Sequence, residues 1–155
     1  MTHAATTHGR SSDGTSSRAA TIERIVPFVH LLLRVVTALL FMQHGAQKLF
    51  GWFANPERPW TGAPPMFSQF WIAGVLELVG GALIAFGLFT RPVAFVLSGQ
   101  MAVAYIMAHA PNAAWPIRNG GEHTLLFCFV FLYLAATGGG PYSLDAVLRD
   151  RRRIR

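Results

Sequence analysis

Four long apolar blocks constrain the fold of this chain more than any other feature. They run from Ile25 to about Trp52, from Met66 to Phe89, from Pro92 to Ala108 and from Glu122 to about Thr137. A hydrocarbon core of ~30 Å needs about 20 residues of helix, so the first two blocks are long enough to cross a bilayer and the third is adequate. We therefore predict an all-α integral membrane protein, a four-helix bundle with four spans.

The fourth block carries the weakest signal. Its uninterrupted apolar part runs only from Leu125 to Ala136, and it spans the membrane only if Glu122, His123 and residues 138–140 sit at the two interfaces. A re-entrant segment is the alternative. The composition agrees with a membrane protein, because 52% of the 155 residues are hydrophobic and 13% are charged, against about 25% charged in a typical soluble domain.

The blocks divide the chain into three regions. Residues 1–24 are rich in Ser, Thr, Ala and Gly, and we expect a disordered cytoplasmic tail without the apolar core of a signal peptide. Residues 25–140 form the four-span domain, and residues 141–155 form a basic cytoplasmic tail. The only cysteine, Cys128, allows no intrachain disulfide and no CxxC pair.

The distribution of cations predicts the orientation of the spans. Nine of the thirteen Lys and Arg residues lie in the two tails and in the turn between the second and third blocks. Positively charged segments are retained in the cytoplasm, so both termini should be cytoplasmic. The net charge of +6 is then a topology signal that also holds anionic lipid headgroups, at about 1 kcal/mol per cation, and no nucleic acid partner is needed.

Three polar residues are predicted to share one depth near the bilayer centre. At ~1.5 Å per residue, Arg34 lies about 15 Å from the cytoplasmic end of the first span, with Glu77 and Gln100 at a similar level on the second and third. Charges in a membrane core usually face the bundle interior and pair. We expect Arg34 and Glu77 to form an ion pair, with Gln100 as a hydrogen-bond partner; this pair could be purely structural, functional or both.

The outer end of the predicted bundle gathers further titratable side chains. His44 and Lys48 share one face of the first helix with Arg34, and Glu122 and His123 open the fourth block after the loop "HAPNAAWPIRNGGEH". The sequence thus predicts a polar cleft above the buried carboxylate. Imidazole and carboxylate groups also suit a metal, but no HxxxH or HxxE pattern is present among these residues, and we expect no metal site.

The order of these motifs resembles that of a known family. The segments "LLLRVVTALLFMQHGAQKLFG", "GVLELVGGALIAFGLFTRPVA", a third span bearing a glutamine, and "NGGEHTLLFCFVFLYLA" are similar to the DoxX family of small bacterial membrane proteins. The resemblance covers roughly residues 25–148. It implies a four-helix bundle in the bacterial inner membrane whose buried polar positions match Arg34, His44, Lys48, Glu77, Gln100, Asn119 and Glu122.

The resemblance also implies a redox setting. The family takes its name from a subunit associated with a terminal quinol oxidase, and a relative is a subunit of thiosulfate:quinone oxidoreductase. This chain lacks a cysteine pair, so sulfur chemistry would need a partner redox protein. Association into a homo-oligomer is left open.

Two classes of function remain. In the first, the protein is a quinone-associated redox protein or a subunit of a membrane oxidoreductase complex, because a quinone ring needs cationic or imidazole donors and a carboxylate that carries protons. No cofactor follows from the residues outright, and a quinone is the candidate. Glu77 and His44 would then be catalytic, and the binding residues would be Arg34, Lys48, Gln100, Asn119, Glu122 and His123. In the second, the protein is a non-enzymatic scaffold that recruits partners; a small-solute transporter is a weaker alternative.

Overall fold

The computed structural model describes residues 12–54, 57 and 61–153, and all the regular elements within these ranges are helices. Three helical segments are long and apolar enough to cross a membrane: Ile22–Phe50, Gln69–Phe86 and Thr90–His109. The fourth apolar helix, α6 (Glu122–Thr137), has 16 residues, which is about 24 Å of helix at 1.5 Å per residue. The predicted all-helical membrane architecture is confirmed, and except for the start of the first helix the helix ends lie close to those expected.

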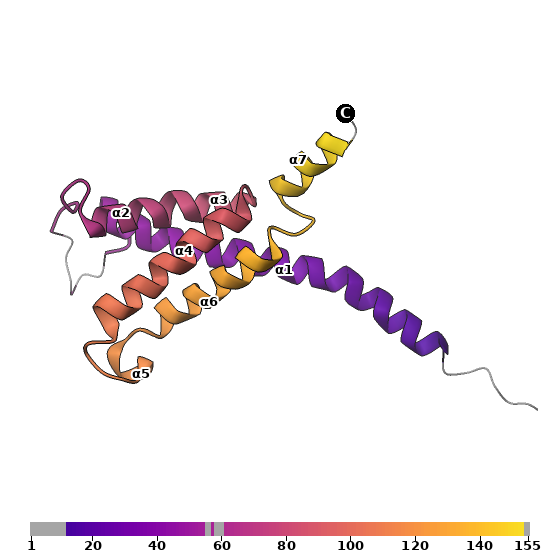
Figure 1. Cartoon of the computed structure of the whole chain (residues 1–155), viewed down its shortest axis with the longest axis horizontal. Coiled ribbons are helices and arrows are strands. Elements are labelled where there is room, and N and C mark those ends of the chain that lie inside the picture. The colour runs from indigo at the N-terminus through magenta and orange to yellow at the C-terminus, as the bar shows by residue number, and fades with distance from the viewer. Residues whose placement is uncertain (1–11, 55–56, 58–60, 154–155) are drawn as a thin grey trace, which may run out of the picture.

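The first helix is longer than the sequence predicted. Helix α1 spans Ser12–Phe50, so residues 12–24, expected to be disordered, continue the first span as a helix. Once a helix is nucleated in the apolar segment, each added residue gains one backbone hydrogen bond, so the helix can extend back through the residues before Ile25. Figure 1 shows this part of α1 projecting beyond the other helices. Residues 1–11 lie outside the described residues.

The second and third spans each change helical geometry partway. The second consists of α2 (Gln69–Val75), the π-helical turn η1 (Leu76–Gly80) and α3 (Gly81–Phe86). The third consists of α4 (Thr90–Ala104) and a second π-helical turn, η2 (Tyr105–His109). Short helices complete the chain: α5 (Pro116–Asn119) precedes α6, and α7 (Leu144–Arg153) follows it.

The helices pack as two antiparallel pairs that are visible in Figure 1. The α2–η1–α3 segment lies along α1, and α6 lies along α4. One end of the assembly holds the end of α1 at Phe50, the start of α2, the end of η2 and the start of α6; we call it the Phe50 end. The opposite end holds the α3–α4 turn at Gly87, and we call it the Gly87 end.

Glycines set the spacing between α1 and the second span. A Cβ atom on Gly45 would lie 2.6 Å from the backbone nitrogen of Leu78 and 2.7 Å from the carbonyl oxygen of Gly74. A Cβ atom on Gly81 would lie 2.6 Å from Met42. Small residues let membrane helices approach backbone to backbone. These close contacts fix the register of α1 against the second span.

The apolar core fills the space between the two pairs. Phe41 of α1 packs edge-on against Phe131 of α6, with ring centroids 4.7 Å apart. Other fully buried residues of the apolar core include Ile84 of α3, Leu97 of α4 and Leu134 of α6. This core closes the assembly from its centre to the Gly87 end.

Candidate functional site

A cavity of about 1060 Å³ lies in the half of the assembly toward the Phe50 end, beside the apolar core. Its walls come from α1, the α2–η1 segment, the α4–η2 segment and α6. Most of the lining side chains are apolar; the polar and titratable ones are His44, Lys48, Gln69, Glu77, Gln100, His109, His123 and Thr124. A mostly apolar cavity with a few convergent polar groups is the usual form of a small-molecule site.

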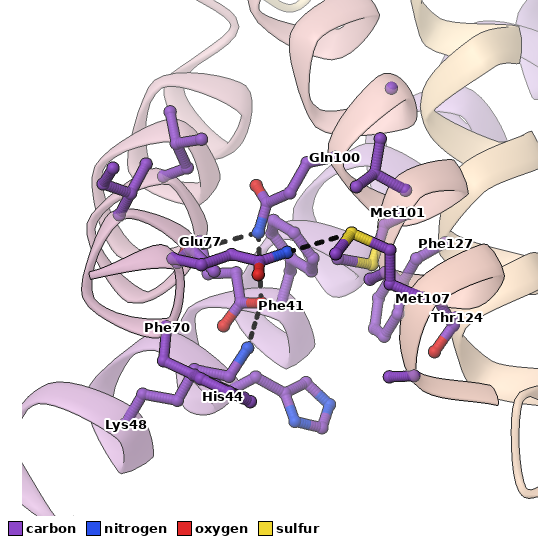
Figure 2. Close-up of a pocket in the computed structure, with 18 of the residues that line it drawn as sticks. Phe41, His44, Lys48, Phe70, Glu77, Gln100, Met101, Met107, Thr124 and Phe127 are labelled. Carbon is purple, nitrogen blue, oxygen red and sulfur yellow. Dashed lines mark hydrogen bonds and ion pairs between the residues drawn. The ribbon is translucent and has the colours of Figure 1, made fainter. Parts of the chain in front are cut away.

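A buried carboxylate anchors the polar side of the cavity. Glu77, on η1, is 1% exposed. Its Oε1 accepts hydrogen bonds from the Lys48 ammonium of α1 and from Gln100 Nε2 of α4, the latter at 3.2 Å. Figure 2 shows the three side chains converging from three helices. Such a pairing allows a charged carboxylate to persist away from water.

The network is only partly satisfied within the described residues. Gln100 Nε2 also donates to the carbonyl oxygen of Ala73 at 3.3 Å, which fixes the orientation of its amide. Glu77 Oε2 and Gln100 Oε1 are buried without a hydrogen-bond partner in the described part of the chain. Unpaired buried acceptors are costly unless a donor reaches them.

The backbone under Glu77 is irregular. Glu77 sits in the π-helical turn η1, and the same cavity is bordered by the second π-helical turn, η2. π-helical turns occur mostly as single turns within α-helices, and they are frequent at functional sites. No spacing rule that we applied to the sequence indicated either turn.

Two histidines face the cavity with unsatisfied ring nitrogens. His44, one helical turn before Lys48, lies edge-on to Phe127 with ring centroids 5.9 Å apart. His44 and His123 are both exposed to the cavity, and no hydrogen-bond partner for either ring is present in residues 12–54, 57 and 61–153. Both rings can therefore donate to or accept from a ligand.

His109 has a different role, because both its ring nitrogens are occupied. Its Nδ1 donates to the carbonyl oxygen of Asn119 at 3.0 Å, which leaves Nε2 to accept from the Thr124 hydroxyl at 3.3 Å. This arrangement ties the end of η2 to the loop at Asn119 and to the start of α6 at Thr124.

The predicted pair between Arg34 and Glu77 is wrong. Arg34 is buried at the Gly87 end, where its guanidinium donates to the carbonyl oxygens of Ile84, Ala85 and Tyr142 at 2.7, 2.8 and 2.6 Å. The glycine-set register places Gly45, not Arg34, beside the turn that carries Glu77. Arg34 lies about 15 Å from His44 along α1, and it satisfies the C-terminal carbonyls of α3.

Two other predicted binding residues lie outside the cavity lining. Asn119 holds the loop: its Nδ2 donates to the carbonyl oxygen of Ala113 at 2.9 Å and its Oδ1 accepts from the amide of Gly121 at 2.8 Å. Glu122 is exposed at the start of α6. Of the predicted site residues, the structure therefore brings together His44, Lys48, Glu77, Gln100 and His123.

The cavity also contains residues that the sequence analysis missed. Gln69 Nε2 of α2 lies 3.3 Å from the sulfur of Met107 on η2 and bridges two helices. Gly99 lines the cavity, and a Cβ atom added to it would meet nothing within 4 Å. Gln69 lies four residues before Ala73, and Gly99 lies three residues after Val96 and four before Val103, as residues on one helical face do, but only the helix packing shows that Gln69 and Gly99 face the same space.

Fold and cavity together define a multi-span α-helical membrane protein with a polar site inside its helices. The DoxX family model matches residues 29–110, and the chain belongs to the DoxX family. An "Uncharacterized protein" from Haemophilus influenzae is 41% identical over 129 residues, covering 80% of this chain and 93% of that protein. No solved structure matches the chain.

Two further relatives carry more informative names. "Putative oxidoreductase CatD" from Bacillus subtilis is 32% identical over 74% of this chain and 83% of its own length. "Inner membrane protein YphA" from Escherichia coli is 30% identical over 77% of this chain and 89% of its own length. Together with the apolar helices, these relatives place the chain in the bacterial inner membrane.

Proposed function

We propose that this protein binds the ring of a quinone-like lipid in its cavity and serves as a membrane subunit of a redox complex. One observation carries the proposal: His44, Lys48, Glu77 and Gln100 converge on a largely apolar cavity of about 1060 Å³ inside a membrane protein. The name of the Bacillus subtilis relative as an oxidoreductase is consistent with this setting.

The residues present fit a quinone ring. Phe41 and Phe127 provide aromatic surface on one wall, and the unsatisfied His44 ring stands edge-on to Phe127. An imidazole N–H can donate to a ring oxygen, and His123 adds a second titratable group in the same cavity. The buried Glu77 and Gln100 acceptors suit a hydroxyl donor after a small side-chain adjustment.

The chain's residues can hold protons close to such a ring. A quinone, when bound, supplies a two-electron, two-proton carrier, and its electrons would be exchanged with a partner redox protein such as a flavoprotein or cytochrome. Lys48 is 31% exposed while the Glu77 side chain is 2% exposed, so their contact connects the surface of the cavity to the buried carboxylate. His44 and Glu77 are thus the groups placed to accept or release protons.

The proposal includes four spans with both termini in the cytoplasm. The α6 helix is shorter than the hydrocarbon core, but tilting neighbours and local thinning accommodate a short span at modest cost. Most Lys and Arg residues lie in the two tails and in the turn at the Gly87 end, which supports a cytoplasmic Gly87 end. A periplasm-dependent reporter fused after Arg155 should be inactive and a cytoplasm-dependent reporter active; the reverse result would refute this orientation.

Retention of native lipids tests the binding proposal. The wild-type protein, purified in mild detergent, should carry quinone detectable in an organic extract, and His44→Ala and Glu77→Gln should lose most of it. Arg34→Lys is the matched control, because Arg34 lies at the opposite end and should not affect retention. Quinone-free wild-type protein, or equal retention in all folded variants, would refute the proposal.

A scaffold function is the second candidate, and one observation favours it. The Lys48–Glu77–Gln100 contacts join three helices to each other, as expected for a purely structural core. The two functions assign different roles to His44. It would bind the ligand in the first, and it would have no role in the second, because it makes no hydrogen bond that would hold the described helices together. If His44→Ala changes neither quinone retention nor partner activity, the scaffold function is favoured.

A further inference from the structure

The cavity has an open side that faces the bilayer. We define the mouth by Gln69, Phe70 and Ile72 of α2 and by Val96, Val103 and Met107 of the α4–η2 segment, all of which line the cavity. The five mouth residues other than Gln69 are between 45% and 67% exposed. Side chains that line a cavity and remain this exposed mark the place where the cavity meets its surroundings, which here are lipid chains.

The mouth exists because the second and third spans diverge. Helix α2 packs mainly on α1, and α4 packs mainly on α6, while the two spans contact each other near η1, α3 and the turn at the Gly87 end. Figure 1 shows the α2 and α4 ribbons moving apart from that turn toward the Phe50 end. Gln69 Nε2 of α2 donates a hydrogen bond across this gap to the sulfur of Met107 on η2, at 3.3 Å.

The dimensions of the mouth match a lipid chain. Val96, Val103 and Met107 lie on one stripe of the third span, and from Val96 to Met107 that stripe is about 16 Å long at 1.5 Å per residue. This length is about half of a ~30 Å hydrocarbon core. The mouth therefore reaches from one interface to the bilayer centre, the depth range that a single leaflet's chains occupy.

We propose that the cavity is loaded sideways from the leaflet at the Phe50 end, through this mouth, and that its ligand carries a long apolar chain that stays in the mouth. The inference rests on the proposed function and adds the route of entry and the shape of the ligand. The ring occupies the polar interior near His44, and the chain lies against Phe70, Ile72, Val96 and Val103. The Gln69–Met107 hydrogen bond joins the two sides of the mouth, and it must break for the ligand to enter.

The chemistry of the cavity walls fits a ligand with one apolar chain and one polar ring. The mouth residues are apolar except for Gln69, whose amide is bound to the Met107 sulfur, so a polar tail has no partner there. The other polar lining residues lie on the inner walls, on η1, α1 and the start of α6, with Gln100 on α4 and His109 on η2. The volume of about 1060 Å³ is at the upper end of the ~300–1,000 Å³ that hold drug-sized ligands, which leaves room for the first part of the chain beside a ring.

Locking the mouth tests this route. In a Cys128→Ala background, Gln69→Cys and Met107→Cys are joined by a short cleavable bis-maleimide, and the full-length protein is reconstituted in lipid nanodiscs. The probes are a benzoquinone bearing a decyl chain and the same ring without a chain. Each single-cysteine protein, treated with the same reagent, is the matched control for the bulk of the adduct. The measurement is the rate at which each probe binds.

We expect the cross-link to slow loading of the decyl probe by about tenfold or more, as when opening of a gate limits entry, and cleavage of the linker should restore the rate. The uncross-linked double variant, which lacks the Gln69–Met107 contact, should load the decyl probe at least as fast as wild type. The adducts of the two single-cysteine proteins set the rate against which the cross-linked protein is compared. Val103→Trp, at a lipid-exposed position, should narrow the mouth and slow the decyl probe without any cysteine chemistry.

The outcomes separate this inference from the proposed function. If the cross-linked protein and Val103→Trp load the decyl probe at the wild-type rate, the lateral route is refuted, while ring binding that still depends on His44 keeps the proposed function intact. If the wild-type protein binds neither probe, the proposed function fails and the route fails with it. If the chain-free ring binds as tightly as the decyl probe after correction for membrane partitioning, the chain does not occupy the mouth.

Discussion

The contact between Lys48 and Glu77 should make these two residues strongly non-additive in stability. Lys48→Met leaves the Glu77 carboxylate, which is 2% exposed, without its cation. Removing one partner of a buried ion pair costs about 3 to 5 kcal/mol, and the lower end applies here because Lys48 is partly exposed. In Glu77→Leu the ammonium can turn toward the cavity, so we expect a loss of only about 1 kcal/mol.

The double variant should then be close to the Glu77→Leu variant, so the coupling free energy equals the cost of Lys48→Met, about 3 kcal/mol. The assay is a double-mutant cycle on the free energy of unfolding, measured by reversible denaturation in mixed micelles. The matched cycle pairs Arg34→Met with Glu77→Leu. Because Arg34 donates to backbone carbonyls at the other end of the assembly, its effect should add to that of Glu77→Leu within about 0.5 kcal/mol.

Two results would refute the reasoning. Additive effects of Lys48→Met and Glu77→Leu would mean that the contact contributes nothing specific to stability. Strong coupling between Arg34 and Glu77 would mean that the register set by Gly45 and Gly81 is wrong, and the location of the cavity with it.

Three further predictions concern the packing of the spans and the Gly87 end. Gly45→Ala should destabilise the protein by more than about 2 kcal/mol, because its Cβ would collide with the backbone of the second span. Gly99→Ala, with open space around the added Cβ, should be neutral or stabilising by up to about 1 kcal/mol. Thermal unfolding of the two variants side by side checks this, and equal stabilities would contradict it. Arg34→Met removes three hydrogen bonds to carbonyl oxygens and should speed hydrogen exchange in residues 138–148 more than around His44; uniform exchange would argue against a local role. Asp145 accepts hydrogen bonds from the backbone amides of Phe89 and Thr90, each at 2.8 Å, and although partial burial alone would raise the pKa of its carboxyl, these bonds outweigh it and hold the pKa below the ordinary value. Because the pKa of the Asp145 carboxyl is lower in the folded state than in the unfolded state, the carboxylate contributes stability that is fully present above the unfolded pKa of about 3.9 and is lost as pH falls through the folded pKa. Asp145→Asn should therefore cost about 1 kcal/mol at neutral pH and nothing at low pH. A difference in stability that does not change with pH would refute the assignment.

Much of the fold was predictable because hydropathy and length decide where a chain crosses a membrane. The apolar blocks end where turn residues begin, and the helices from Gln69 and from Glu122 start close to the expected positions. Gly74 and Gly81 lie seven residues apart on one helical face of the second span, a pattern of small residues that predicts close packing of another helix, and their close contacts with α1 confirm that prediction.

The position of Arg34 was not predictable by counting residues from a span's end. Such counting fixes depth only if the start of the helix in the membrane is known, and α1 begins well before the expected start. The register of two helices is instead set where their backbones touch, at Gly45 and Gly81. Arg34, which was expected to face Glu77, therefore donates hydrogen bonds to carbonyl oxygens at the end of α3. Lys48, on the same face of α1 two helical turns beyond Phe41, pairs with Glu77 instead.

The site was predictable in composition but not in shape. The sequence indicated that His44, Lys48, Glu77, Gln100 and His123 would share a polar region, and these five residues do line the cavity. The π-helical turns and the gap between α2 and α4 depend on how whole helices pack, and local residue patterns carry no signal for them. Gln69 and Met107 were missed for that reason.

Filling the cavity tests the central claim most directly. Gly99→Leu directs a side chain into the space, where an added Cβ atom meets no neighbour within 4 Å, so the fold should remain intact. Equilibrium binding of the decyl-chain benzoquinone to the purified protein is measured for wild type, Gly99→Ala and Gly99→Leu. We predict that wild type binds it, that Gly99→Ala binds within about twofold of wild type, and that Gly99→Leu loses about tenfold or more in affinity at unchanged stability. Absence of binding to wild type, or equal binding by a folded Gly99→Leu variant, would contradict the claim that this cavity is the ligand site.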